Sequence, residues 1–338
     1  MYGKRSFTEI DDSIPLVGCI AFGCIDRGTN IIQVRPISTC PLSCLFCSTD
    51  AGPNSRIRQT EYVVVLDHLV DWIDKIVDFK GRRGIEAHID TVGDPLTYPH
   101  LVELVARVKQ IRGVEVVSIQ THGSLLNERI LDDLSSAGLD RVNLSIDALN
   151  PQLAKKLANT SWYDVEKVME MAEYIVENTR MDLLIAPVWV PAVNDGELPR
   201  IIEFALKIGA GKRFPPLGIQ KYEVHKHGRK VRGVKSMSWW SFYRRLREWE
   251  KIYRVKLILH PYDFGIHKRP MLPVSYKKFE RVTLRVVAPG WLKSEKLAVT
   301  SSGDRVMSLI NADNIPIGAK VRARVLVNKH NIYIAEAI

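Results

Sequence analysis

Three cysteines in one short segment constrain this chain more than any other feature. They stand in the run Cys40-Pro-Leu-Ser-Cys44-Leu-Phe46-Cys47, which has the spacing CxxxCxxC. Thiolates placed four and three residues apart can converge on one cuboidal [4Fe–4S] cluster from a single loop. A fourth cysteine would complete the ligation of the irons, whereas three cysteines leave one iron open to a substrate or a cofactor.

Structural zinc is the main alternative for this segment. Zinc sites usually combine two CxxC pairs, or add histidine to complete a tetrahedron. No second CxxC pair faces Cys44 and Cys47, and no histidine lies within twenty residues of them. Cys19 or Cys24 could supply a fourth ligand, so zinc stays open. Five cysteines in 338 residues are too few for a secreted disulfide framework.

The cysteine motif resembles that of the radical S-adenosylmethionine (SAM) superfamily. Phe46, the aromatic residue before the last cysteine, also fits the pattern. The resemblance implies two cofactors, a [4Fe–4S] cluster held by the three cysteines and SAM bound to the open iron. It also implies an electron donor such as ferredoxin or flavodoxin, since one electron from the cluster cleaves SAM to a 5′-deoxyadenosyl radical.

Composition places the chain among ordinary globular proteins, with 46% apolar and 25% charged residues. The N-terminal residues lack a signal-peptide pattern, and no run reaches the roughly 18 apolar residues of a membrane span. We therefore expect no membrane association and a cytoplasmic location, where thiolates stay reduced. The formal net charge of +10 favours a polyanionic partner.

Strand-like and helix-like segments alternate from about residue 30 to residue 260, which predicts an α/β fold with parallel strands. Six βα units can be counted, and the resemblance implies a partial (β/α)6 barrel. Strands are expected over 31–35, 85–90, 114–120, 141–146, 182–190 and 217–222, and helices over 63–79, 101–111, 128–137, 163–178 and 198–208. We assign residues 1–29 to an N-terminal extension and 30–265 to the barrel.

The alternation of strand and helix patterns ends before the C-terminal residues. Residues 266–279 are rich in proline and lysine and read as a linker. Residues 280–338 contain five short strand patterns separated by turns, over 281–287, 296–300, 305–309, 320–327 and 331–335. This pattern predicts a small all-β, OB-like barrel. It resembles the TRAM domain found at the C-terminus of several RNA-modifying enzymes.

Functional side chains are expected where parallel strands end. Gly93-Asp94-Pro95 resembles the segment whose backbone binds the methionine amino group of SAM, with aspartate in place of the usual glutamate. Ser145 and Asp147 resemble the ribose-binding pair, and Val188 and Val190 lie where relatives contact adenine. Each segment also has a purely structural explanation. Residues 93–95 could form a turn, Ser145 and Asp147 could cap a helix, and Val188 and Val190 could belong to a core strand.

Three further residues are candidates. His122 follows a predicted strand and is expected either to line the substrate cavity or to be structural. Cys19 and Cys24 precede the barrel, and some radical SAM RNA methylases use two additional cysteines, one as methyl carrier and one to resolve the adduct. That role needs a nucleophilic thiolate, whereas buried cysteines are usually inert.

The segment 221–256 carries twelve Lys or Arg and three Glu, and aromatic residues are interspersed among them. Basic side chains neutralise phosphates and aromatic rings stack on unpaired bases, so RNA is the expected partner. The alternative is a helix that packs on the barrel through Trp240, Tyr243, Leu246 and Trp249 and exposes a solvated basic face. The candidate RNA contacts are Arg229, Lys230, Arg232, Arg244, Arg245, Trp291, Lys293 and Lys329.

Together these features predict a radical SAM enzyme that modifies tRNA or rRNA, by base methylation or a related reaction. Only about thirty residues precede the first barrel strand, which leaves no room for the second-cluster domain of methylthiotransferases. A radical SAM enzyme acting on a small molecule or a peptide is one alternative. A non-catalytic RNA-binding protein stabilised by a metal is another.

Overall fold

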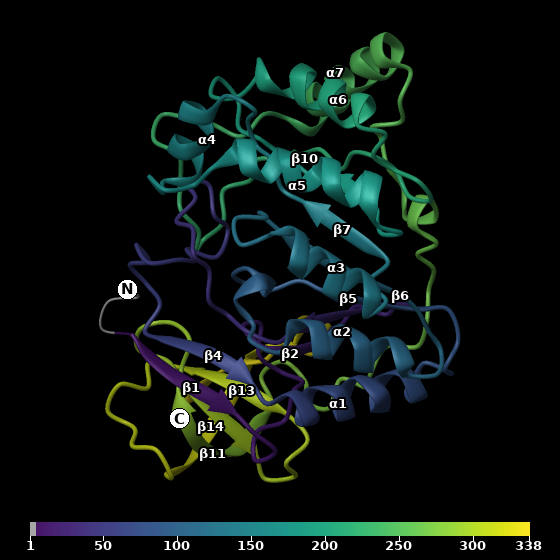
Figure 1. The fold of residues 1–338 in the computed structure, drawn as a ribbon. Helices are drawn as coiled ribbons and strands as arrows, with labels where there is room; N and C mark the ends of the chain where they lie inside the picture. Colours follow the sequence, from purple (N-terminus) through teal and green to yellow (C-terminus); the bar gives the residue numbers. More distant parts are fainter. Residues whose placement is uncertain (1–4) are drawn as a thin grey trace.

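The computed structural model describes residues 5–338, and a curved six-stranded sheet forms its centre (Figure 1). The strand order is β2-β3-β5-β6-β7-β8. The strands are β2 (Gly23–Asp26), β3 (Ile31–Arg35), β5 (Ile85–Ile89), β6 (Val114–Thr121), β7 (Arg141–Leu144) and β8 (Asp182–Ile185). β2 pairs antiparallel with β3, and the other five strands run parallel. Parallel neighbours need crossover connections, and helices supply them here.

The last two strands expected of the barrel are shorter than the sequence pattern indicates. β8 ends at Ile185, and β9 (Val188–Trp189) pairs in parallel with β10 (Gln220–Lys221) in a separate two-stranded sheet. Pro187 interrupts the predicted strand because proline has no N–H to donate to a neighbouring strand. Leu217 forms a single parallel bridge with Ile185. The segment predicted as the sixth barrel strand therefore still lies beside β8.

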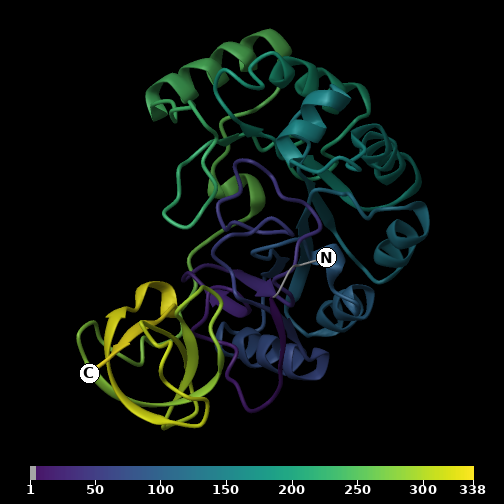
Figure 2. The ribbon, with the colours of Figure 1, turned by 90° about the vertical axis from the view of Figure 1, so that its left-hand side faces the viewer.

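Helices cover the outer side of this sheet, and the N-terminal segments lie on its inner side (Figure 2). The helices are α1 (Leu66–Phe79), α2 (Leu101–Gln110), α3 (Glu128–Ser136), α4 (Pro151–Ala158), α5 (Val165–Asn178), α6 (Glu197–Lys207) and α7 (Trp239–Tyr253). Short 3-10 helices occupy Pro95–Thr97, Pro261–Phe264 and Lys329–Asn331. No helix within residues 5–338 has both the length and the apolar character needed to cross a bilayer.

Two local predictions need correction. The helix expected over 63–79 begins only at Leu66, because residues before it form β4 (Thr60–Val64), which pairs with β1 (Ser6–Ile10). α4 was not predicted, although Asn150 caps it and Pro151 occupies its first turn. Both are helix-start signals, since proline is tolerated where no intrahelical N–H bond is lost.

The C-terminal residues form a closed five-stranded barrel with the order β11-β12-β13-β15-β14. The strands are β11 (Arg281–Pro289), β12 (Lys296–Thr300), β13 (Val306–Ile310), β14 (Lys320–Val327) and β15 (Ile334–Ala337), each within a few residues of its predicted position. β13 and β15 are parallel, and the other neighbours are antiparallel. The barrel encloses its own hydrophobic cluster, including Leu284, Val286 and Tyr333.

The segments expected to be an extension and a linker are bound tightly to both domains. The Lys80 ammonium is fully buried and donates to the Asp26 carboxylate at 2.7 Å and to the carbonyls of Thr29 at 2.9 Å and Pro270 at 3.0 Å. The other Asp26 oxygen accepts from the Leu272 amide at 2.7 Å. This pair therefore fixes the linker against α1 and β2.

We expect Lys80→Met to lower the free energy of unfolding by about 3–5 kcal/mol, because it leaves the buried Asp26 carboxylate without its counter-charge. Urea denaturation followed by circular dichroism measures the change. Arg82→Met is the control, since Arg82 pairs with Asp74 and Asp78 near the surface, where solvent screens the pair and a much smaller loss is expected. Equal losses in the two variants would contradict a stabilising role for the buried pair.

Candidate functional site

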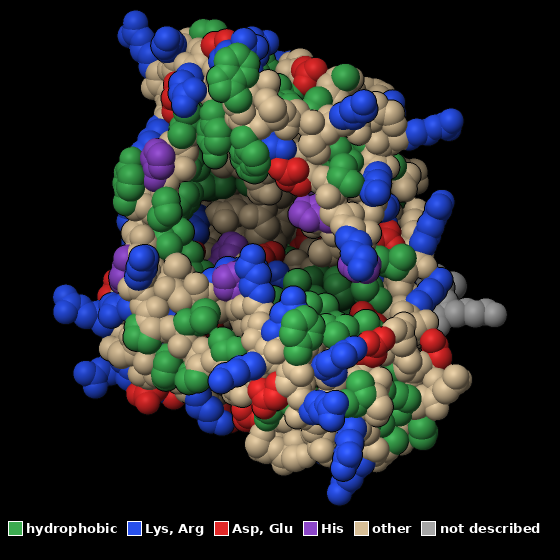
Figure 3. Space-filling model, turned by 180° about the vertical axis from the view of Figure 1, so that it is seen from behind, with side chains coloured by type: hydrophobic (Ala, Val, Ile, Leu, Met, Phe, Trp, Pro, Cys, Tyr) green, Lys and Arg blue, Asp and Glu red, His purple; other side chains and the backbone are tan. Residues whose placement is uncertain are grey.

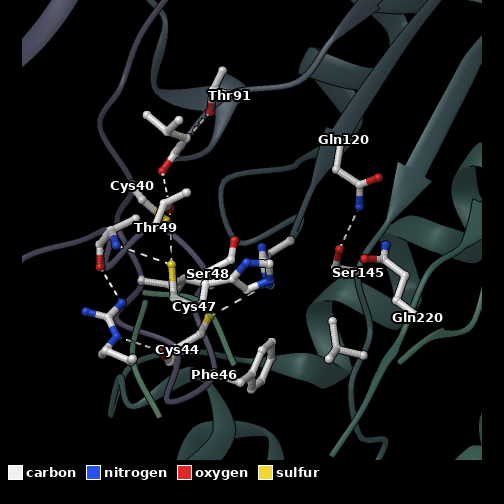
Figure 4. Close-up of a pocket in the computed structure, with 18 of the residues that line it drawn as sticks. Cys40, Cys44, Phe46, Cys47, Ser48, Thr49, Thr91, Gln120, Ser145 and Gln220 are labelled. Atoms are coloured by element: carbon white, nitrogen blue, oxygen red, sulfur yellow. Dashed lines mark hydrogen bonds between the residues drawn. The ribbon is translucent and has the colours of Figure 1, made fainter. Parts of the chain in front are cut away.

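The ends of the parallel strands open into one cavity of about 360 Å³. The cysteine loop follows β3, and the residues that follow β5, β6 and β7 line the facing walls (Figure 4). The lining includes Cys40, Cys44, Phe46, Cys47, Thr91, Gly93, Gln120, His122, Ser145, Val188, Lys221, His225 and Arg229. The fold therefore brings most of the residues predicted to bind the cluster and SAM to one place.

The three cysteines face this cavity from a buried loop. Cys40 and Cys44 are buried, and Cys47 is partly exposed. The Cys47 sulfur accepts from the Ala51 amide at 3.2 Å, and the Cys44 sulfur lies 3.7 Å from Nε2 of His122. Burial is the main cause that raises the pKa of the Cys40 and Cys44 thiols. Three thiols of one loop at a cavity with further polar walls suit a cluster that has one open iron.

Helix α4 supports the cysteine loop from behind. The amides of Ser43 and Leu45 donate to the carbonyls of Ala158 at 3.1 Å and Leu157 at 2.9 Å. These carbonyls belong to the last turn of the helix, where they have no intrahelical partner. The unpredicted helix thus positions the residues on either side of Cys44.

Arg58 fixes the other side of the loop, and sequence reasoning missed it. Its guanidinium is fully buried and donates to the carbonyls of Ser38 at 2.8 Å, Thr49 at 3.1 Å and Val92, and to Glu61 at 3.2 Å. Of the three carbonyls, that of Ser38 precedes the first cysteine, that of Thr49 follows the last cysteine, and that of Val92 follows β5. Nothing in the local sequence distinguishes Arg58 from the neighbouring Arg56, which is why the pattern alone could not identify it.

Arg229 was predicted to contact RNA, and the structure places it on the cysteine loop instead. Its side chain donates to the Cys44 carbonyl at 2.7 Å, to Asp50 at 2.9 Å and to the Ala51 carbonyl. Its amide donates to the Cys47 carbonyl at 2.8 Å. With these bonds made, the guanidinium is committed to the cavity wall.

The residues of Gly93-Asp94-Pro95 have separate positions. Gly93 lines the cavity, and a Cβ atom there would lie 1.9 Å from the Thr39 carbonyl oxygen. Only glycine therefore permits this approach to the cysteine loop. Asp94 is buried and accepts from the hydroxyl of Thr121 at 2.9 Å and from the amide of His122 at 3.1 Å. Pro95 is buried at the start of the 3-10 helix.

The two residues predicted to bind the ribose also have different positions. Ser145 lines the cavity, and its hydroxyl accepts from the Gln120 amide group at 2.8 Å. Asp147 lies behind the wall, accepts from the Val188 amide at 2.8 Å and lies 3.9 Å from His122 Nε2. Burial raises the pKa of the Asp147 carboxyl, while His122 opposes the shift.

The predicted adenine contacts have different environments. Val188 lines the cavity, whereas Val190 is completely buried and its amide donates to Asn194 at 2.8 Å. Val190 is therefore a core residue. His122 does line the cavity.

A polar group on the inner side of the sheet was not predicted. His88 and Asp90 line the cavity. His88 Nδ1 lies 2.8 Å from the Ser118 hydroxyl, and Asp90 accepts from Gln33 at 3.0 Å. Polar residues alternate with apolar ones in Ile85-Glu-Ala-His-Ile-Asp90, and this alternation in a parallel strand is the signal that could have indicated an inward polar face.

The structure brings neither Cys19 nor Cys24 to the cavity. Cys24 lies within β2, and Cys19 lies next to Gly18, which contacts the C-terminal barrel at Val306. Both thiols are buried, and burial raises the pKa of Cys19 to about 11 and of Cys24 to about 12. Neither is the nucleophilic thiolate near the cluster that the prediction required.

The other predicted RNA contacts are mostly exposed. Lys230, Arg232, Arg244, Arg245, Lys293 and Lys329 are exposed. Trp291 is the exception, since it is 7% exposed and its ring lies 4.8 Å from the Arg58 guanidinium. It joins the barrel to the core and is not available to stack on a base.

The inward face of α7 also differs from the alternative reading. Phe242, Leu246 and Trp249 are buried, whereas Trp240 is 66% exposed with Arg244 over its ring at 4.6 Å. Trp239 is also exposed. The helix therefore packs on the core and still presents aromatic and basic side chains outward.

Comparison with known proteins identifies the family of the central domain. The model of the radical SAM superfamily matches residues 34–205. An uncharacterised protein of Methanocaldococcus jannaschii is 42% identical over 355 residues, covering 99% of this chain and 81% of that protein. A GTP 3′,8-cyclase of Chlorobaculum tepidum is 26% identical over 200 residues, covering 59% of this chain and 56% of the cyclase.

Among solved structures, Streptococcus suis SuiB superposes with a TM-score of 0.50 at 17% sequence identity. The match covers 72% of this chain and 49% of SuiB. At this identity the likeness concerns the fold alone. The chain spans only about half the length of SuiB and of the Chlorobaculum cyclase.

We expect Cys44→Ala to abolish iron retention and SAM cleavage together, because two remaining thiolates cannot hold the cluster. Iron content after reconstitution and release of 5′-deoxyadenosine are the measurements. Cys24→Ala is the control, since that thiol is buried outside the cavity and both readouts should stay at the wild-type level. SAM cleavage by Cys44→Ala would refute the assignment of the cluster ligands.

Arg229→Ala should loosen the cysteine loop, because it removes the side-chain bonds to Cys44, Asp50 and Ala51. The expected result is a severalfold faster loss of iron to a chelator, followed by the decay of the cluster absorbance. Arg232→Ala is the matched control, because Arg232 is exposed on the same segment. Identical rates in the two variants would show that Arg229 does not secure the loop.

Proposed function

The chain belongs to the radical SAM superfamily, whose members use a [4Fe–4S] cluster and SAM, and we propose that this member modifies RNA. The proposed substrate is tRNA or rRNA, and the proposed product is a methylated or otherwise altered base. The C-terminal barrel carries this proposal. Its five strands close in the order β11-β12-β13-β15-β14, which supports our interpretation of it as an OB-like barrel, and OB folds bind oligonucleotides and oligosaccharides.

The cavity residues have proposed roles toward the cofactors. Cys40, Cys44 and Cys47 hold the cluster, the backbone around Gly93 binds the methionine end of SAM, and Ser145 binds its ribose. The bound cluster supplies the electron that cleaves SAM to a 5′-deoxyadenosyl radical. Phe46 and Val188 provide apolar walls that exclude water from the cavity.

The surroundings of the cavity favour an anionic substrate. Figure 3 shows a hollow at the centre of one face, with histidine, lysine and arginine side chains around its rim. Lys221 and His225 line the cavity together with Glu223, which pairs with Lys221 at 2.5 Å, and exposed Lys230 and Arg232 lie on the same segment. Exposed Trp239 and Trp240 at the start of α7 offer stacking surfaces for unpaired bases. We propose a ferredoxin or flavodoxin as the electron donor.

The placement of the cysteines bears on the reaction. All five cysteines lie in the described residues, and only the three of the CxxxCxxC motif line the cavity. A methyl group carried on Cys19 or Cys24 would not reach a substrate there. We therefore propose a reaction in which neither Cys19 nor Cys24 carries a methyl group.

A small phosphorylated molecule is the second candidate substrate. The matching cyclase is named for GTP and aligns over 59% of this chain. The cavity is of a size that holds a small ligand, and Lys221 and His225 could bind a phosphate. This candidate gives the C-terminal barrel no role in substrate binding.

Mass spectrometry of digested RNA tests the proposal, comparing cells with the gene, without it, and complemented with Cys44→Ala. The expected result is a modified nucleoside that disappears on deletion and returns only with the wild-type gene. An unchanged nucleoside profile would overturn the RNA proposal in favour of a small substrate. The family assignment would stand in either case.

A further inference from the structure

The outward face of two barrel strands is predominantly basic. In β11 and β14, apolar side chains such as Leu284 and Ala323 point inward, and the alternate residues are exposed. Because side chains alternate across a strand, the exposed positions form two adjacent rows on one face. The basic members are Arg281, Arg285, Lys320, Arg322 and Arg324, and we call them the β11–β14 face.

The register of the two strands sets like charges opposite one another. Arg281 pairs with Arg324, and Arg285 pairs with Lys320. Like charges directly opposite destabilise an antiparallel pair. Among the described residues, one ion pair involves this face, between Arg324 and Glu336 at 3.8 Å. The arrangement costs stability in the free protein, and an anion that contacts both rows would offset that cost.

Much of the surface that OB folds ordinarily use is occupied here by contacts with the core. That surface comprises strands 2 and 3 and the loops joining strands 1–2 and 4–5. β12 and β13 are buried almost throughout, and the Val306 amide donates to the Val17 carbonyl at 3.1 Å. The first loop is held by Gln59, which donates to the carbonyls of Gly290 at 3.1 Å and Glu295 at 2.8 Å. This side of the barrel contacts the core.

Two further features lie beside the β11–β14 face. A groove of about 360 Å³ is lined by Arg285, Lys320 and the hydroxyl residues Thr283, Ser301 and Ser302. Its basic and hydroxyl groups suit phosphate oxygens and ribose hydroxyls. Phe279, just before β11, is 62% exposed, and its ring lies 4.9 Å from the Lys278 ammonium. An exposed ring next to cationic rows is a stacking surface for a base.

We propose that the β11–β14 face binds the phosphate backbone of an unpaired RNA segment, with Phe279 stacking on a base. The inference rests on the proposed function and deepens it, because it assigns RNA to a face of the barrel other than the one OB folds ordinarily use. Along each strand, consecutive side chains on the same face are two residues apart and are separated by about 6.8 Å. A single extended strand can therefore contact successive basic side chains.

The test combines Arg281→Gln, Arg285→Gln and Arg322→Gln in the full chain and measures binding to bulk tRNA and to a uridine homopolymer across a salt series. Each lost phosphate contact should reduce the slope of log K against log salt by about 0.7, so the triple variant should lose about 2. At about 0.1 M salt this corresponds to roughly 100-fold weaker binding. Phe279→Ala should weaken binding of the homopolymer about tenfold with an unchanged salt slope.

The matched control combines Lys75→Gln, Arg129→Gln and Lys207→Gln on the outer helices, where all three side chains are exposed. It removes the same charge and should bind RNA as the wild type does. Equal binding by the two triple variants would overturn the face while leaving the RNA proposal intact. A wild-type chain that binds neither RNA would overturn the proposed function itself. Tighter binding to phosphatidylserine vesicles than to RNA, lost in the β11–β14 variant, would reassign the face to a lipid surface.

Discussion

The buried guanidinium of Arg58 is the interaction on which the site depends. A charge without solvent contact must have its donors satisfied by fixed acceptors, and these acceptors come from three separate segments and from Glu61. The ring of Trp291 packs on the same group from the C-terminal barrel. The cysteine loop, the loop after β5 and the barrel are therefore positioned against one charge, and none can shift without breaking a bond to it.

This arrangement explains why the barrel has an unusual free surface. The loop that carries Trp291 is committed to Arg58, and Gly18 approaches Val306 so closely that a Cβ atom there would lie 1.8 Å from the Val306 oxygen. Contacts of this kind require β12 and β13 to face the core. Within the strands of the barrel, the basic side chains that remain exposed are then those of β11 and β14. Domain docking therefore uses the β12 and β13 side of the barrel surface, and the proposed RNA-binding face lies on β11 and β14.

The sequence predicted the elements whose signals are local. The five barrel strands and the parallel βα units follow from periodicity. Gly93, Ser145 and Val188 were identified by the family resemblance, and the rule that strand ends converge predicted that such residues would meet. The roles of Arg58, Arg229 and Trp291 could not be predicted, because each depends on a partner far away in the chain. Trp291 illustrates the difficulty: a tryptophan beside a lysine in a turn fits a base-stacking loop and a domain contact equally well, and only the docked fold distinguishes them.

Within each predicted binding motif, one residue faces the cavity and another residue contacts the surrounding loops. In Gly93-Asp94-Pro95, the glycine faces the cavity and the aspartate faces away, where it joins the 3-10 helix to the end of β6 through Leu96 and Thr121. Asp147 likewise holds the start of β9 while Ser145 faces the cavity. A carboxylate in such a position acts on the geometry of its loop and not on a ligand. The residues that face the cavity are Gly93 and Ser145, and the two aspartates hold the loops that carry them.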